Sequence, residues 1–317
     1  MAAAAGVAIR ARGLQRRFGE LRAVRDVSFE VAAGEIFGLV GPDGAGKTTT
    51  MRMLAGVLGA HGGSIEIDGI DVLADPESAK LRLSYMPQRF GLYEDLTVAE
   101  NLRFYADLFG VAAAQRRSRG AELIAAAGLA GFESRLAGRL SGGMKQKLGL
   151  VCALIHTPSV LLLDEPTTGV DPVSRRDFWA ILYRLRETGV AIVMATAYMD
   201  EAERCSRLAL FHAGEVRYCD TPASLKSRMP GALLAVGAER PRELRERLAR
   251  LPGVLGTLLM GDRVHVRVDD AARRIEDIRA ALAGEPGFAV EPVEPGIEDV
   301  FVALLEQPAQ DAHGQPR

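Results

Sequence analysis

One short stretch near the start of this chain limits its possible folds more than any other feature. It contains the pattern G-x-x-x-x-G-K-[ST], in which backbone N–H groups cradle nucleotide phosphates. The apolar residues 36–40 before it predict a buried strand, and residues 49–58 carry apolar side chains at helical spacing. Strand, loop and helix therefore agree on a phosphate-binding P-loop. The residues predicted to contact nucleotide are Gly41, Pro42, Asp43, Gly44, Ala45, Gly46, Lys47, Thr48 and Thr49.

Each residue type in this loop suits a chemical role. Glycines let the backbone approach phosphates closely, and the positive end of the following helix attracts anions. Lys47 is expected to reach the β- and γ-phosphates, and the Thr48 hydroxyl is expected to bind Mg²⁺. Asp43 is unusual, because it places a carboxylate in a loop that must hold phosphates.

A second cluster follows the apolar residues 160–163. Asp164 and Glu165 end this predicted strand, at the edge where open α/β sheets bind ligands. A carboxylate at Asp164 suits Mg²⁺. Glu165 is placed to accept a proton from an attacking water, which makes it the predicted catalytic base. Asp171 is the predicted N-cap of a helix that ends near residue 185.

The chain before the P-loop predicts a small antiparallel sheet. Residues 7–12 and 27–31 alternate apolar and polar side chains, as strands with one buried face do. Phe18 lies between them. An aromatic residue there either joins the core or stacks on the adenine of a bound nucleotide, and the local pattern favours the core.

A glycine pair precedes the helix predicted at residues 144–155. Ser141, Gly142 and Gly143 leave backbone N–H groups at a positive helix end. Taken alone, they indicate either an anion contact or a tight turn.

Composition limits the partners. The 317 residues suffice for about two domains, and 48% hydrophobic with 25% charged residues is typical of a soluble globular protein. A formal net charge of −2 gives no support for nucleic-acid binding, so none is expected. No apolar run approaches the ~20 residues of a membrane span, and the three cysteines lack metal-binding spacing. Membrane association is therefore expected only through a partner, with the chain in a reducing cytoplasm.

The predicted organisation has two domains between disordered tails at 1–6 and 307–317. The first, residues 7–225, is an α/β domain with a RecA-like P-loop core, an antiparallel β edge sheet and a helical insert over about 89–158. The second, residues 230–306, is a small α+β appendage in the ferredoxin-like order β-α-β-β-α-β. No cluster in it looks catalytic, and its charged helices are either solvated faces or a docking surface.

The order and spacing of the motifs resemble the ATP-binding cassette of ABC transporters over about residues 7–225. This resemblance implies a P-loop NTPase fold with ATP and Mg²⁺ as cofactors. It gives Phe18 the place of the adenine-stacking aromatic, which reverses the local interpretation. It implies that Gln88 is a Mg²⁺ ligand that acts with Lys47 and Glu165 in catalysis. The motifs that carry the resemblance are the P-loop, Gln88, Leu140-Ser141-Gly142-Gly143, Leu163-Asp164-Glu165-Pro166 and Asp171.

The same resemblance implies a dimer of cassettes. Ser141, Gly142 and Gly143 resemble the signature that contacts the γ-phosphate of a nucleotide held by the opposite cassette. Asp171 resembles the aspartate at the interface between the two cassettes.

A finer resemblance points to export. Residues 88–106 look like the coupling region of single-cassette subunits of daunorubicin-resistance exporters, and residues 295–301 look like their C-terminal extension. Residues 41–43 and 85–96 look closest to tandem-cassette multidrug-efflux ATPases, which pair with ABC-2 type permeases. The implied protein is the ATPase subunit of an exporter, held at the inner face of the cell membrane by its permease. The alternatives are a soluble ABC ATPase without a transporter, or a regulatory cassette with weak hydrolysis.

One position departs from the family pattern. Ala197 occupies the place of the switch histidine, which is thought to hold the γ-phosphate and to position Glu165. Losing one such donor typically costs about 10²–10³ in rate. We therefore expect a slow site on this chain and a working dimer with a different cassette rather than with a second copy. In the alternative, Thr196, Tyr198 or a partner residue replaces the histidine.

Overall fold

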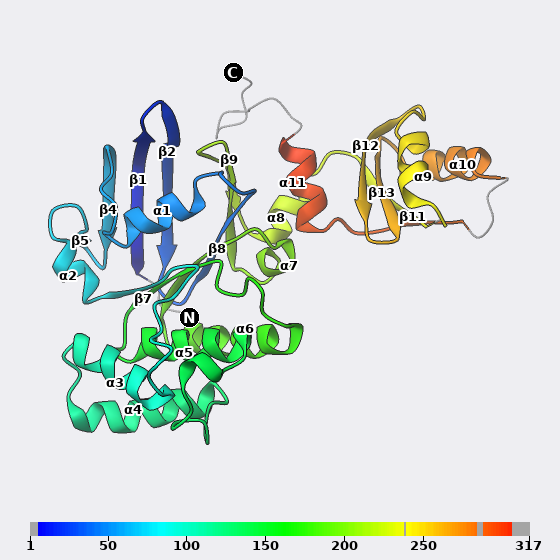
Figure 1. The fold of residues 1–317 in the computed structure, drawn as a ribbon. Helices are drawn as coiled ribbons and strands as arrows, with labels where there is room; N and C mark the ends of the chain where they lie inside the picture. The colour runs from blue at the N-terminus through cyan, green and yellow to red at the C-terminus, as the bar shows by residue number, and fades with distance from the viewer. Residues whose placement is uncertain (1–5, 238, 284–287, 306–317) are drawn as a thin grey trace, which may run out of the picture. The chain divides into compact units, whose positions relative to one another are not determined.

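The computed structural model describes residues 6–237, 239–283 and 288–305. The chain divides into two compact units, residues 1–219 and 220–317 (Figure 1). Each unit has its own sheet system and its own hydrophobic core. The first unit ends earlier in the sequence than the first domain that the sequence predicts.

The predicted disordered tails, 1–6 and 307–317, lie outside the described residues apart from Gly6. Within the described ranges, no helix combines the length and the apolar character that crossing a membrane requires.

A six-stranded sheet forms the centre of the first unit. In spatial order its strands are β10 (Glu215–Asp220), β9 (Arg207–His212), β3 (Ile36–Val40), β8 (Ala191–Thr196), β7 (Val160–Asp164) and β6 (Leu83–Met86). β3, β7 and β8 are buried along their whole length, as parallel strands covered on both faces are. Because these strands run parallel, their carboxyl ends meet at one edge of the sheet.

A second sheet flanks the first. Its strands, in spatial order, are β2 (Leu21–Ala32), β1 (Val7–Phe18), β4 (Gly62–Ile67) and β5 (Ile70–Asp71). The strands predicted at 7–12 and 27–31 are too short, because β1 and β2 form one long hairpin that pairs Phe18 with Leu21 at its tip. Register shifts along the pair interrupt the alternation of side chains, and this hides the outer half of the hairpin from the sequence pattern.

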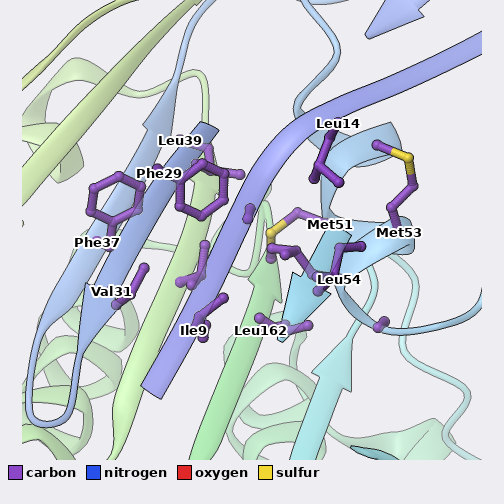
Figure 2. Packing of buried hydrophobic residues seen from close by; sticks show 14 of the residues in the cluster. Ile9, Leu14, Phe29, Val31, Phe37, Leu39, Met51, Met53, Leu54 and Leu162 are labelled. Carbon is purple, nitrogen blue, oxygen red and sulfur yellow. The ribbon is translucent and has the colours of Figure 1, made fainter. Parts of the chain in front are cut away.

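The core of the first unit lies between the two sheets and includes α1 (Lys47–Leu54) (Figure 2). Phe29 of β2 stacks on Phe37 of β3 with ring centroids 5.1 Å apart. Met51 and Leu54 are fully buried, and they fix α1 directly behind the P-loop. The helix begins before the predicted residue 49 and ends before residue 58, since Gly56 with φ 63° follows its last turn.

Helices form the rest of the first unit. They are α2 (Pro76–Lys80), α3 (Val98–Leu108), α4 (Ala113–Ala126), α5 (Gly142–Leu154), α6 (Pro172–Glu187) and α7 (Met199–Ala202). The helical insert is built from α3 and α4 packed against α5, and α5 also contacts α6. A capping box begins α3: Thr97 Oγ1 accepts from the Glu100 N–H, and the Glu100 carboxylate accepts from the Thr97 N–H at 2.8 Å.

The second unit contains an antiparallel four-stranded sheet. Its strands, in spatial order, are β12 (Val254–Met260), β13 (Arg263–Val268), β11 (Ala232–Gly237) and β14 (Ala289–Pro292). The helices are α8 (Pro222–Ser227), α9 (Pro241–Leu248), α10 (Ala271–Ala281) and α11 (Ile297–Leu305). Between β11 and β14 the element order is β-α-β-β-α-β, which confirms the predicted ferredoxin-like pattern. The pattern did not predict α8 or α11.

One charged side chain of α10 is part of the packing rather than of a solvated face. Arg274 is 6% exposed and donates two hydrogen bonds to Asp269, at 2.7 and 2.9 Å, and one to Asp277 at 2.6 Å. The guanidinium also holds the pKa of Asp269 at about 2. A Cβ at Gly253 would lie 2.0 Å from Arg274 Nε, so the guanidinium packs directly on this glycine.

Candidate functional site

The P-loop joins the carboxyl end of β3 to the first turn of α1, as the sequence predicts. Backbone from both sheets holds it in place. A Cβ at Gly41 would lie 2.4 Å from the Phe211 carbonyl oxygen, and one at Gly46 would lie 2.6 Å from the Ala23 carbonyl oxygen. Gly46 also has φ 106°, a conformation that side chains rarely allow. These glycines are therefore required by packing as well as by phosphate access.

Lys47 is folded across the loop. Its ammonium group donates to the carbonyl oxygens of Gly41, at 2.7 Å, and Pro42, at 3.0 Å, and the residue is only 4% exposed. Burial lowers the pKa of this lysine, and the carboxylates of Glu165 and Asp43 act in the opposite direction. Asp43, the unusual loop carboxylate, thus helps to keep Lys47 charged.

Asp164 ends β7 beneath the loop. Its Oδ1 accepts from the Thr48 hydroxyl at 3.0 Å, and its Oδ2 accepts from the Tyr85 hydroxyl at 3.2 Å. Asp164 is 1% exposed, and burial raises its pKa, while the two hydroxyl donors act to lower it. Burial also raises the pKa of Tyr85 to about 12, so this phenol remains a donor at neutral pH.

Glu165 occupies a conformation that few non-glycine residues adopt, with φ 49°. Its N–H donates to the Ala195 carbonyl oxygen at 2.8 Å, across the β7–β8 pair. Its carboxylate Oε2 accepts from Gln88 Nε2 at 2.9 Å and from the Thr168 hydroxyl at 3.4 Å. The two predicted catalytic residues Gln88 and Glu165 therefore contact each other directly.

Ala197 follows β8 at the same edge of the sheet. Asp164 pairs with Ala195 in the parallel register, so Ala197 and Glu165 both lie just beyond paired strand ends. Ala197 is exposed, and its methyl group offers no hydrogen-bond donor.

The P-loop forms one wall of a cleft of about 270 Å³, close to the lower limit for ligand pockets. Phe18 at the hairpin tip also lines this cleft. It is 46% exposed, so the interpretation of Phe18 as a core residue is wrong. The Arg16 guanidinium lies 4.9 Å from its ring centroid. The cleft is lined by Phe18, Leu21, Ala23, Asp43, Gly44, Ala45, Gly46, Lys47, Thr48, Thr49 and Glu165.

The remaining predicted nucleotide contacts do not line this cleft, namely Ser141, Gly142, Gly143 and Asp171. Ser141 is the N-cap of α5, where its hydroxyl accepts from the Met144 N–H at 3.3 Å. Asp171 is the N-cap of α6, as predicted, and accepts from the Ser174 N–H at 2.9 Å. A Cβ at Gly143 would lie 2.3 Å from Ser174 Oγ, so Gly143 packs against the start of α6. Gly142 is exposed beside it.

The residues present fit a magnesium–nucleotide complex. The Thr48 hydroxyl and an Asp164 carboxylate oxygen lie 3.0 Å apart, and both are hard oxygen ligands of the kind that Mg²⁺ prefers. The buried ammonium of Lys47 and the loop N–H groups suit phosphate oxygens. Gln88, predicted as a further ligand, contacts Glu165 through its amide nitrogen.

Four contributors to the site were not predicted. Tyr85 contacts Asp164 from the neighbouring strand β6, Thr168 contacts Glu165, and Leu21 and Ala23 line the cleft from β2. Tyr85 had a detectable signal, because a polar-tipped residue in an apolar strand beside the catalytic strand usually needs a partner. Leu21 and Ala23 had none, since their place depends on the length of the hairpin.

Comparisons with known proteins agree with this geometry. Residues 24–168 match the family model described as ABC transporter. The probable multidrug ABC transporter ATP-binding protein YbhF of Escherichia coli (strain K12) is 44% identical over 297 residues, covering 92% of this chain and 51% of that protein. The Nod factor export ATP-binding protein I of Burkholderia thailandensis is 37% identical, covering 94% of this chain and 97% of that protein.

The daunorubicin/doxorubicin resistance ATP-binding protein DrrA of Streptomyces peucetius is 34% identical, covering 96% of this chain and 94% of that protein. This chain thus spans about half the length of the Escherichia coli relative and nearly all of the other two.

Solved structures confirm the predicted α/β fold class. An ATP-binding subunit of an ABC transporter aligns with a TM-score of 0.65 and 29% identity, over 70% of this chain and 93% of that chain. A dimeric bacterial ABC transporter cassette aligns with a TM-score of 0.61 and 25% identity, over 67% of this chain and 98% of that chain.

Proposed function

This chain belongs to the ABC transporter family, and from that premise we propose that it is the ATP-binding and ATP-hydrolysing subunit of an exporter. The observation that carries the proposal is the convergence of Lys47, Thr48, Asp164 and Glu165 at one edge of the central sheet. These residues combine a phosphate-binding cation, two metal-binding oxygens and a proton acceptor.

Each residue takes a separate part in hydrolysis. Lys47 exchanges its carbonyl partners for the β- and γ-phosphate oxygens, and Phe18 stacks on the adenine. Thr48 and Asp164 would hold Mg²⁺, which would supply neutralisation of charge on the phosphates. Glu165 accepts a proton from the attacking water, and Gln88 keeps its carboxylate oriented through their hydrogen bond.

Nucleotide binding tests this function through Lys47. Hydrogen bonds to a charged group contribute about 1.5–3 kcal/mol, so Lys47→Met should weaken Mg-ATP binding by about 10- to 150-fold. Lys80→Met is the matched control, because the Lys80 side chain is 42% exposed and pairs with Glu77 on α2. A melting curve establishes that each variant is folded. Equal ATP affinities for wild type and Lys47→Met would contradict the proposal that the P-loop binds ATP through Lys47.

The named relatives act in multidrug transport, Nod factor export and daunorubicin resistance. We infer that this chain also serves small-molecule export, on the cytoplasmic face of the membrane beside an ABC-2 type permease. Tyr93 is 47% exposed, and the buried Asn101 fixes it by accepting from its N–H and donating to its carbonyl, both at 2.9 Å. The adjacent Glu94 pairs with Lys145 on α5 at 2.6 Å. This segment therefore links an exposed aromatic to the helix that Ser141 caps.

Crosslinking tests the permease contact. A photoreactive residue at Tyr93 should capture the membrane subunit from native membranes. The same residue at Leu81, which is 66% exposed on the same unit, should not. Capture of the permease from both positions, or from neither, contradicts the proposed docking segment.

We further propose that the working dimer pairs this chain with a different cassette. Two-fold symmetry in a homodimer would place Ala197 in both sites. Thr196 is a poor substitute donor, because its buried hydroxyl already donates to Glu201 at 2.6 Å. The signature residue Ser141 is retained, so a partner cassette with its own histidine would have a complete site.

ATP turnover of the purified chain tests this pairing. The wild-type chain alone should hydrolyse ATP slowly, and Ala197→His should raise the rate by about 10²-fold or more. Fast turnover by the isolated chain that Ala197→His leaves unchanged would overturn the asymmetric dimer.

A further inference from the structure

A fully buried carboxylate connects the segments that follow strands β7 and β8. Glu201 on α7 is 0% exposed. Its Oε1 accepts from the Thr167 hydroxyl at 2.5 Å and from Trp179 Nε1 at 3.3 Å, and its Oε2 accepts from the Thr196 hydroxyl at 2.6 Å. The three donors come from three separate segments, and each donor residue is at most 1% exposed.

Each hydroxyl fixes a different piece of backbone. Thr167 lies two residues beyond Glu165, next to Thr168, whose hydroxyl contacts the Glu165 carboxylate at 3.4 Å. Thr196 precedes Ala197, and its Oγ1 also accepts from the Tyr198 N–H at 3.0 Å. The Glu201 carboxylate thus joins the segment after Glu165 to the turn that carries Ala197.

We propose that Glu201 is a positioning residue, which holds Glu165 against Gln88 by tying these two segments together. The inference rests on the proposed ATPase function. A carboxylate fits the place because it only accepts, and all three neighbours donate. Glu201 does not line the nucleotide cleft, so it acts through Glu165.

The experiment compares two perturbations of the same region in the full-length chain. Glu201→Gln replaces one carboxylate oxygen with an amide NH₂ group. That group donates hydrogen bonds, and it would face a neighbour that also donates. Phe178→Leu is the matched control, because Phe178 is 1% exposed on α6 beside Trp179 and makes no hydrogen bond to Glu201. Amide hydrogen exchange, Mg-ATP affinity and kcat are measured for both.

We expect exchange to rise in residues 164–170 and 195–200 in Glu201→Gln and not in Phe178→Leu. Mg-ATP affinity should stay within about threefold of wild type, while kcat falls by about 10- to 100-fold, as for a displaced catalytic group. The turnover comparison uses the Ala197→His background, where the rate is measurable. Exchange that stays at the wild-type level, or a kcat loss no larger than that of Phe178→Leu, overturns the proposal.

A milder variant covers the case in which Glu201→Gln does not fold. Thr196→Val keeps the shape of the side chain but removes its hydroxyl, which donates to Glu201 and accepts from the Tyr198 N–H. It should reproduce the loss of kcat, and Thr196→Ser should restore it. Failure of Thr196→Ser to restore kcat assigns a packing role to this site and contradicts the proposal. If wild type and Ala197→His hydrolyse no ATP, the proposed function fails, and the exchange data still decide whether Glu201 holds the two segments.

Discussion

The two glycines after Ser141 should respond in opposite ways to the same substitution. A Cβ at Gly143 would lie 2.3 Å from Ser174 Oγ and 2.4 Å from Ser174 Cβ, which no side-chain rotation relieves. A Cβ at Gly142 has only the Gly169 carbonyl oxygen near it, at the ordinary distance of 3.8 Å. The requirement for glycine at 143 therefore comes from contact between α5 and α6, whatever contact it makes with nucleotide.

The expected magnitude follows from the cost of an inserted methyl group in packed structure. Gly143→Ala should destabilise the first unit by about 1–3 kcal/mol, because α5 or α6 must shift. For a unit of this size, that corresponds to a fall in melting temperature of about 2–12 °C. Gly142→Ala should change stability by less than about 1 kcal/mol, and in the stabilising direction, since alanine favours the helix. Urea titration and thermal melting of both variants give the comparison.

A double mutant isolates the contact. Ser174→Gly removes the two atoms nearest to the new methyl group, leaves Asp171 Oδ2 at 3.3 Å from it, and keeps the backbone N–H of residue 174 that donates to Asp171. The pair Gly143→Ala and Ser174→Gly should therefore recover about 0.5–3 kcal/mol relative to the sum of the single changes. Equal stability of Gly143→Ala and Gly142→Ala would refute the reasoning.

Two further predictions concern the cleft and the second unit. Phe18→Ala should weaken ATP binding by about 5- to 150-fold, which is the contribution of one base–aromatic stack. The melting temperature should change little, because Phe18 is half-exposed. Isothermal titration measures the affinity and a melting curve the stability, and an unchanged affinity contradicts adenine stacking. Arg274 holds the pKa of Asp269 at about 2, below the ordinary 3.8, so this pair stabilises the fold above about pH 4 and the stabilisation is lost as the pH falls toward 2. Melting curves between pH 2 and 6 should show that Asp269→Asn removes this part of the pH dependence, and an unchanged profile contradicts it.

The parts of the site that are local in sequence were predictable. The P-loop carries its own geometry, because its glycines, its lysine and the following helix are consecutive. Asp164 and Glu165 were predictable from the strand before them, since the carboxyl end of a parallel strand faces the ligand edge.

Contacts between distant segments were not predictable from the sequence. Glu201 reaches Thr167, Trp179 and Thr196 only because β8, α6 and α7 pack together, and nothing in the local pattern marks it as buried. A glutamate on a short helix is usually solvated. Phe18 shows a related limit, since irregular pairing along the β1–β2 hairpin hid the strand that carries it.

The short helices α2 and α8 are indicated in the sequence by their first residues and not by hydrophobic periodicity. Each begins with proline, preceded by a capping side chain. Asp75 accepts from the Ser78 N–H, and Thr221 accepts from the Ser224 N–H, both at 3.1 Å. Capping chemistry followed by proline therefore predicts helices that are too short for periodicity to reveal.

The central claim is that Glu165 activates water at this chain's own nucleotide site. The most direct measurement is steady-state ATP turnover of the purified chain carrying Ala197→His, with and without Glu165→Gln, together with Mg-ATP affinity for both. Loss of a general base costs about 10²–10⁴ in rate, so Glu165→Gln should reduce kcat by at least that lower factor while ATP still binds. Turnover that Glu165→Gln leaves unchanged would contradict the account.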